Sequence, residues 1–190
     1  MKRNRVSLKY QWIRPKVERR EDETIVRVVV ETPRGSRHKF ALDAEIGAFV
    51  LKETLASGLA WPYDYGFIPR TLGLDGDPLD VLVLMDEPTF PGCVMTVRLL
   101  GYIGVTKDGV VNNRFVGCLV PRAEASLSTD GYATIDDLPD KLVDELQVFL
   151  REYSEEKGHQ IELTGCHGPA EALTLIEAGE RAFEDRQADE

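Results

Sequence analysis

Residues 62–83 have the sequence PYDYGFIPRTLGLDGDPLDVLV, which contains the strongest motif in the chain. The second half of this stretch places three carboxylates within six residues, at Asp75, Asp77 and Asp80. Their mutual repulsion costs free energy unless a cation or a basic group compensates it. Hard divalent cations such as Mg2+ prefer oxygen ligands of this kind. The cluster therefore predicts a metal site, whereas an isolated triplet of this type is also typical of an acidic turn at Asp75 and Gly76.

Residues outside the acid cluster supply groups that are suited to binding phosphate. Tyr65 lies just upstream, and its hydroxyl is a suitable donor to a phosphate, as are the cations Lys39, Lys52 and Arg114. Glu31 ends a predicted strand and offers an acceptor for a metal-bound water. Acids that hold metal beside bases that hold phosphate indicate a site for phosphoryl hydrolysis. The alternative is that Tyr65 belongs to the core and that each Lys is a solvated surface charge.

Short segments rich in β-branched residues predict strands on both sides of this stretch. These segments are residues 25–31, 38–42, 48–51, 80–84, 94–103 and 114–120. The first two flank turn residues at 32–36, so we expect them to pair as a hairpin. Residues 61–80 are dense in aromatic residues, Gly and Pro, and predict a compact loop. Many short strands separated by turns favour a small barrel.

The last third of the chain changes to the period of a helix. Apolar residues in 140–157 recur on one helical face, with Asp137 as the expected N-cap and Pro139 in the first turn. A second helix is predicted over residues 170–183. The residues after Phe183 are expected to be frayed, with residues 185–190 as a polar tail.

Charge is distributed unevenly along the chain. Residues 1–20 contain eight basic side chains and a single acid, Glu18, and so carry a charge of +7, whereas the remainder carries −17. We expect a solvated basic arm over 1–20, followed by a single domain over 21–184. The alternative for the arm is a contact with an acidic surface, on either a neighbouring subunit or a polyanion.

Composition excludes several classes of protein. The formal net charge of −10 argues against nucleic-acid binding over the whole surface, and binding through a barrel and the basic arm is a weak hypothesis because the body is acidic. No apolar run approaches the length of a membrane span, and no apolar segment of a signal peptide follows the first residues. The three cysteines, Cys93, Cys118 and Cys166, form no paired motif, so we expect a reduced, cytoplasmic protein.

The stretches Pro62–Thr71 and Asp75–Val83 resemble the soluble inorganic pyrophosphatases of family I, through the pattern Asp-Gly-Asp-Pro-x-Asp-x-x-Val. The resemblance runs from about Glu23 to the final helix and omits the basic arm. It implies an α+β, mainly β fold, with a five-stranded, OB-like closed barrel flanked by two helices. It also implies hydrolysis of pyrophosphate to two phosphates with Mg2+, with Mn2+ as a possible substitute. A homo-oligomer is expected, with a hexamer favoured over a dimer.

The resemblance also implies roles for individual residues. Asp75, Asp77 and Asp80 match the central metal ligands, and Asp77 would be the general base for the attacking water. Glu31 matches a catalytic Glu. Phosphate would be bound by residues that match the family's basic and tyrosine positions, which here are Lys39, Lys52, Tyr65, Arg114 and Tyr153. The loop over 106–114 normally supplies two further acidic ligands, for which Asp108 and Asn112 are the candidates here.

The chain departs from the family pattern at several of these positions. The departures are Ala41 for an acid, Lys52 for an Arg, Trp61 for a Tyr, Lys107 or Asp108 for one Asp, Asn112 for another Asp, Arg114 for a Lys and Ser154 for a Lys. An Asn oxygen can ligate Mg2+ but brings no negative charge, so we expect at least one metal site to be weakened. Two hypotheses follow: an Mg2+-dependent pyrophosphatase, or a catalytically weakened relative that binds phosphate, pyrophosphate or a nucleotide.

Overall fold

The computed structural model describes residues 18–20, 23–43, 45–120, 129 and 131–189 of the chain. The predicted basic arm lies outside these residues except at its end. There, strand β1 (Glu18–Arg20) pairs antiparallel with β2 (Glu23–Thr32).

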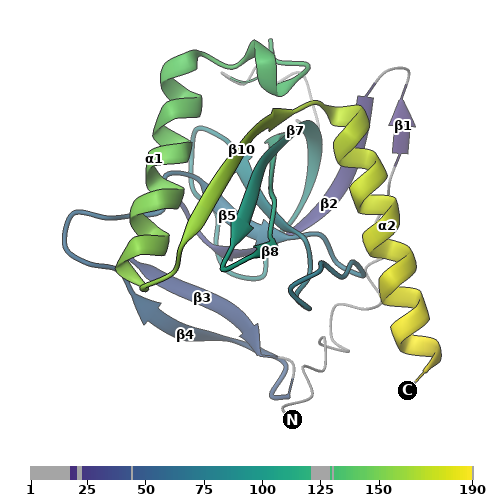
Figure 1. Ribbon diagram of the computed structural model, residues 1–190, viewed down its shortest axis with the longest axis horizontal. Coiled ribbons are helices and arrows are strands. Elements are labelled where there is room, and N and C mark those ends of the chain that lie inside the picture. The colour runs from purple at the N-terminus through teal and green to yellow at the C-terminus, as the bar shows by residue number, and fades with distance from the viewer. Residues whose placement is uncertain (1–17, 21–22, 44, 121–128, 130, 190) are drawn as a thin grey trace.

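Five strands form the centre of the fold (Figure 1). They are β2, β5 (Asp64–Phe67), β6 (Asp80–Leu84), β7 (Val94–Lys107) and β9 (Arg114–Leu119). Pairing runs in the order β2–β5–β6–β9–β7, and β7 pairs back to β2, so the ring is closed. The β6–β9 pair is parallel and the other four pairs are antiparallel. This ring and its two flanking helices confirm the expected OB-like α+β architecture.

Strands β3 (His38–Asp43) and β4 (Ala48–Thr54) form a separate two-stranded sheet. The expected hairpin between 25–31 and 38–42 is therefore wrong. Both edges of β2 are already paired, one with β5 and the other with β7, so no backbone edge remains for β3. Side-chain hydrogen bonds join β3 to β2 instead: the Leu42 N–H donates to Glu31 Oε1 at 2.9 Å, the Phe40 N–H donates to Thr32 Oγ1 at 3.0 Å, and the Thr32 hydroxyl donates to the Phe40 carbonyl oxygen at 3.2 Å.

The segment at 61–80 was expected to be a loop, yet it contains β5, whose four residues are all buried. Gly66 allows this strand to lie close to β2, because a Cβ at that position would stand 2.1 Å from the carbonyl oxygen of Val29. Gly66 is one of the residues whose composition suggested a loop. It is instead required by the close contact between two strands.

The helices follow the predicted pattern, with changes at their ends. Helix α1 (Asp140–Glu156) begins after Pro139, and the predicted cap, Asp137, instead closes the short 3-10 helix η1 (Ile135–Asp137). Asp137 Oδ2 accepts hydrogen bonds from the N–H groups of Thr134 and Ala133, so it caps the preceding turn. Helix α2 (Pro169–Ala188) continues into the residues that were expected to fray, which corrects that prediction.

Two further strands complete the sheet. Strand β8 (Val110–Val111) pairs with the end of β7, and β10 (Ile161–His167) lies along β7 between the two helices in sequence. The turn between β7 and β8 lies at Asp108 and Gly109.

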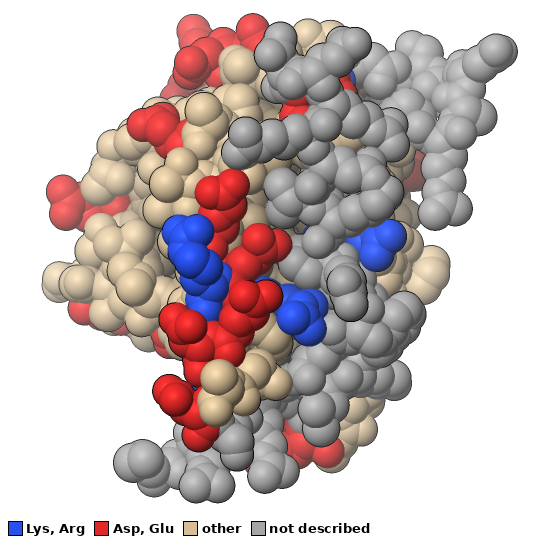
Figure 2. Space-filling model, turned by 90° about the vertical axis from the view of Figure 1, so that its right-hand side faces the viewer, with Lys and Arg blue, Asp and Glu red and all other residues tan. Residues whose placement is uncertain are grey.

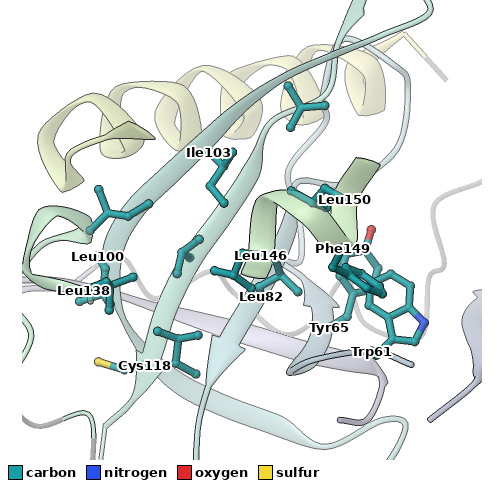
Figure 3. Close-up of a cluster of buried hydrophobic side chains, with 14 of the residues drawn as sticks. Trp61, Tyr65, Leu82, Leu100, Ile103, Cys118, Leu138, Leu146, Phe149 and Leu150 are labelled. Carbon is teal, nitrogen blue, oxygen red and sulfur yellow. The ribbon is translucent and has the colours of Figure 1, made fainter. Parts of the chain in front are cut away.

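Helix α1 covers one core cluster of the ring. Figure 3 shows Phe149 and Leu150 of this helix among Trp61, Tyr65 and Leu82, all of which are buried. Burying a large apolar side chain stabilises the fold by roughly 1.5–3 kcal/mol. This cluster therefore fixes the aromatic residues that lie beneath the cationic side chains described below.

Helix α2 covers the second cluster, in which Ala172 and Ile176 pack against strand residues such as Val28. Its opposite face is charged, with Glu184 and Asp185 exposed to solvent. Figure 2, seen from the side of this helix, shows acidic side chains beside Lys and Arg. No helix in the described ranges has the length and apolar character needed to cross a membrane.

Candidate active site

The acid cluster lies in the turn that leads from β5 into β6. Asp75 and Asp77 are exposed, and Asp80 is partly buried at the start of β6. Gly76 between them has a φ of 86°, a conformation that glycine adopts without strain. The Asp77 N–H donates to Asp75 Oδ1 at 3.2 Å. The turn therefore holds the three predicted carboxylates on one short segment that opens to solvent.

The cluster disfavours full ionisation of its own members. Partial desolvation raises the pKa of Asp77, and the charges of Asp75 and Asp80 raise it further, while Lys39 and Lys107 oppose the shift. Partial desolvation likewise raises the pKa of Asp75, to which Asp80 also contributes. Raised carboxylate pKa values mean that negative charge is destabilised here, so a bound cation would be favoured.

Arg114 connects the cluster to the rest of the site. Its Nη1 lies 2.9 Å from Asp80 Oδ2, with both side chains largely buried. Arg114 also donates to the carbonyl oxygen of Asn112 at 2.8 Å and to the side-chain oxygen of the same residue. The hydroxyl of Tyr65, a residue that is 4% exposed, is also hydrogen-bonded to Asp80. Asp80 is therefore the point where the acids meet both a cation and a phenol.

Glu31 lies beside the cluster at the end of β2. Burial raises its pKa to about 7, helped by the charges of Asp80 and Asp77 and opposed by the hydrogen bond from the Leu42 N–H and by the charge of Lys39. A carboxyl with a pKa near neutrality exchanges protons readily at physiological pH, which suits a role in general acid–base chemistry.

Glu31 predicts a pH dependence of stability in protein treated with a chelator. Its folded-state pKa is higher than its unfolded value, so the native state retains a proton that the unfolded state has lost between about pH 4.5 and 7. The free energy of unfolding is therefore expected to fall by roughly 3 kcal/mol as pH rises through this window. Urea unfolding in EDTA at about pH 5 and about pH 8 measures the effect.

Glu31→Gln is the matched variant for this measurement. Its unfolding free energy is expected to fall less steeply over the same window, with the remaining slope coming from Asp75 and Asp77. Equal slopes for the parent and the variant would contradict the assignment to Glu31.

A pocket of about 320 Å³ opens next to the acid cluster. It is lined mainly by basic side chains and by residues of α1 and its C-terminal end. The lining residues are Lys39, Ala41, Lys52, Glu53, Lys107, Arg114, Tyr153, Ser154, Lys157 and His159. The list includes every predicted phosphate-binding residue except Tyr65, namely Lys39, Lys52, Arg114 and Tyr153. The structure thus places the predicted anion-binding residues in one pocket that shares Arg114 with the acid cluster.

Lys39 and Tyr153, which both line this pocket, contact each other. Lys39 Nζ donates to the Tyr153 hydroxyl at 2.8 Å and lies 5.2 Å from the centroid of that ring. The same ammonium group lies 5.7 Å from the Tyr65 ring and 5.9 Å from the Trp61 ring. Cation–π contacts of this kind hold a lysine over an aromatic floor without neutralising its charge, so it stays available to an anion.

Three residues of the pocket, Glu53, Lys157 and His159, were not predicted from the sequence. In the β3–β4 register, Glu53 pairs with Lys39 and Leu51 pairs with Phe40, so Lys52 is the extra residue of a bulge. A bulge sets two neighbouring residues opposite a single partner, which explains why both Lys52 and Glu53 reach the pocket. A strict alternation along β4 would not have placed them together.

Lys157 supplies a cation near the position where a Lys was expected to follow Tyr153. The residue at that position, Ser154, is buried and also lines the pocket. Lys157 lies just after the end of α1, and its Nζ lies 2.7 Å from Glu53 Oε2. The available clue to this role was the position of Lys157, a basic residue at the end of the helix predicted over 140–157.

The loop at 106–114 places its residues differently from the expectation for metal ligands. Asp108 Oδ2 lies 2.6 Å from His159 Nδ1, and its Oδ1 accepts from the Gln160 N–H at 3.0 Å, so the carboxylate is held by the segment after α1. Lys107, by contrast, lines the pocket and lowers the pKa of Asp77. The loop therefore brings the cation Lys107 toward the acid cluster. The metal-binding roles of Asp108 and Asn112 stay predictions.

The donor set fits a hydrated hard cation. In the part of the chain that the structure describes, no three His, Cys, Asp or Glu side chains converge on one point as a preformed metal cage. Mg2+ is commonly held by one or two carboxylates together with waters and substrate phosphates, and it does not require such a cage. The exposed carboxylates of Asp75 and Asp77, with Asp80 and Glu31 beside them, meet that requirement.

Comparisons with known proteins agree with this arrangement. The sequence profile of the inorganic pyrophosphatase family matches residues 28–184. The inorganic pyrophosphatase of Geobacillus stearothermophilus is 36% identical over 156 residues, which cover 82% of this chain and 92% of that protein. That of Synechocystis sp. is 38% identical over 153 residues, which cover 80% of this chain and 88% of that protein. The crystal structure of inorganic pyrophosphatase from Thermus thermophilus matches with a TM-score of 0.77 and 33% identity, covering 88% of this chain and 95% of that one. The chain therefore belongs to the inorganic pyrophosphatase family.

Proposed function

We propose that the chain hydrolyses inorganic pyrophosphate to two phosphates at the site described above, with Mg2+ as the metal and Mn2+ as an alternative. As a member of its family, the chain is a hydrolase that acts on pyrophosphate. The observation that carries the assignment to this site is the ion pair between Arg114 of the pocket and Asp80 of the acid cluster. An anion bound at this junction meets phosphate-binding cations on one side and cation-binding carboxylates on the other.

In this proposal, Asp75, Asp77 and Asp80 would hold the divalent cations. When bound, these cations would neutralise charge on the phosphoryl groups and lower the pKa of the attacking water. Asp77 would accept the proton of that water at a carboxylate oxygen. Glu31, with a pKa of about 7, would act as a second acceptor beside it.

Binding and orientation of pyrophosphate are assigned to the pocket. Lys39, Lys52 and Arg114 would pair with phosphate oxygens, and the hydroxyls of Tyr65 and Tyr153 would donate to them. Arg114 offers a planar fork of donors, whereas the lysines act as point charges. Asp108 and Asn112 contact His159 and Arg114, and these contacts would compete with or orient their oxygens for a metal.

A phosphate-release assay on the full chain tests the proposal. We expect phosphate to appear from pyrophosphate in the presence of Mg2+, to a smaller or similar extent with Mn2+, and not in EDTA. An arm with inorganic triphosphate measures selectivity for the shorter substrate. Binding of pyrophosphate by calorimetry without metal-dependent release would contradict hydrolysis and support the weakened, anion-binding alternative.

We also propose that the chain acts as a cytoplasmic homo-oligomer, with a hexamer favoured over a dimer. This proposal rests on the family resemblance, and sedimentation of the full chain would distinguish the two states.

A further inference from the structure

The pocket contains one feature that its phosphate-binding role does not explain. Among the described residues that line it, Glu53 is the one acid, and it stands with five cations: Lys39, Lys52, Lys107, Arg114 and Lys157. A carboxylate in an anion-binding pocket repels the ligand, so its presence needs a reason.

Both carboxylate oxygens of Glu53 are engaged by donors that face the pocket. Oε1 accepts from the Tyr153 hydroxyl at 2.8 Å, and Oε2 lies 2.7 Å from Lys157 Nζ. Lys39 donates to the same Tyr153 hydroxyl, so the lysine, the tyrosine, the carboxylate and Lys157 form one chain of contacts. Burial alone would raise the pKa of Glu53, but the hydrogen bonds from Lys157 and Tyr153 outweigh it and hold the pKa below its ordinary value.

These contacts satisfy the same donors that a phosphate group would use. A carboxylate and a phosphate both accept from an ammonium group and from a phenol, and a single donor cannot satisfy both at full strength. The side chains of Glu53 and Lys157 are 27% and 24% exposed, so an entering anion can reach the pair without opening the core. Lys157 lies just after the end of α1, and its flexible four-carbon side chain can turn from the carboxylate to the ligand.

We propose that Glu53 is a specificity-determining residue that competes with phosphate for Lys157 and the Tyr153 hydroxyl, and that Lys157 is a phosphate-binding residue of this pocket. The inference rests on the proposed function, because it presumes that the pocket binds phosphate. Its consequence is that Glu53 weakens binding of the product phosphate. A ligand with more phosphate oxygens displaces the carboxylate more effectively than a single phosphate does.

Titration of inorganic phosphate into the purified chain in Mg2+ buffer, followed by calorimetry, tests the inference. Glu53→Gln keeps the shape of the side chain but loses the charge that holds Lys157. We expect this variant to bind phosphate about tenfold more tightly than the parent. Lys157→Gln is expected to bind phosphate about tenfold more weakly. Glu45→Gln, a matched loss of charge at the exposed turn of the same hairpin, is expected to leave the Kd unchanged.

The double variant separates competition for Lys157 from a general effect of charge. If Glu53 acts by occupying Lys157, most of the tenfold gain disappears when Glu53→Gln is made in the Lys157→Gln background. An undiminished gain in that background, or an unchanged or weaker phosphate Kd in Glu53→Gln alone, overturns the inference. Thermal unfolding of each variant verifies that the fold is intact.

The proposed function fails in a different way. A parent chain that neither releases phosphate from pyrophosphate nor binds phosphate would overturn the proposed function, and the inference with it. A parent chain that hydrolyses pyrophosphate while Glu53→Gln leaves phosphate binding unchanged would overturn the inference alone.

Discussion

Asp77→Asn is expected to lower kcat for pyrophosphate hydrolysis by about 10³-fold. The amide keeps the size of the carboxylate, but it accepts no proton from the attacking water and brings no charge to a bound cation. The backbone of the turn is expected to stay in place, because the Asp77 N–H still donates to Asp75 Oδ1 and the Gly73 N–H still donates to the Asp77 carbonyl. Steady-state phosphate release at saturating Mg2+ measures the loss.

The same substitution is expected to stabilise the metal-free fold slightly, since it removes a charge that Asp75 and Asp80 destabilise. A variant that is inactive yet no less stable than its parent would distinguish loss of chemistry from loss of structure. Asp185→Asn, at an exposed acid of α2, is the matched control and should leave kcat unchanged. Retention of more than about a tenth of the parental kcat by Asp77→Asn would rule out a role as general base.

Trp61→Ala is expected to reduce the free energy of unfolding by about 3–5 kcal/mol. Trp61 is 2% exposed, and its ring centroid lies 4.3 Å from that of Tyr65, 5.1 Å from that of Phe149 and 5.3 Å from that of Tyr153. Truncation leaves a cavity between the ring of strands and α1, and it removes the support of two tyrosines that the proposed function uses. Urea unfolding measures the stability, and phosphate release by the remaining folded protein is expected to fall as well.

Trp61→Phe separates the loss of packing from the loss of a polar contact. The indole Nε1 of Trp61 is buried without a hydrogen-bond partner among the described residues, so replacing the indole by a phenyl ring sacrifices no hydrogen bond. We expect this variant to lose about 1–2 kcal/mol, much less than the alanine variant. Equal losses for the two variants would show that packing by the aromatic ring does not account for the stability.

The sequence was sufficient for the architecture but not for the pairing of its strands. Apolar and β-branched runs correctly indicated β2, β6, β7 and β9, because these strands are largely buried. Their order around the ring depends on contacts between residues far apart in sequence, which no local pattern encodes. The hairpin expected at 25–42 illustrates this, because turn chemistry at 32–36 favoured local pairing while β5 and β7 occupied both edges of β2.

For the site, the sequence identified the residues whose chemistry is unusual on its own, namely three carboxylates in one short turn. It did not identify Glu53, because the direction of that side chain depends on a bulge at Lys52 that alternation along β4 does not predict. Nor did it show that Asp108 would turn toward His159, a contact between residues about fifty positions apart. Side-chain direction in a loop or at a bulge is a tertiary property, whereas a cluster of like charges is visible in the sequence itself.

The separate β3–β4 sheet has a consequence for how the protein holds its ligand. The hairpin supplies Lys39, Lys52 and Glu53, whereas the ring supplies the acid cluster and Arg114. Side chains rather than a continuous backbone ladder join these two bodies. A pyrophosphate that contacts both would act as a cross-link between them. Part of the free energy of substrate binding would then stabilise the association of the β3–β4 hairpin with the ring of strands. The bound substrate would therefore strengthen the tertiary structure of its own binding site.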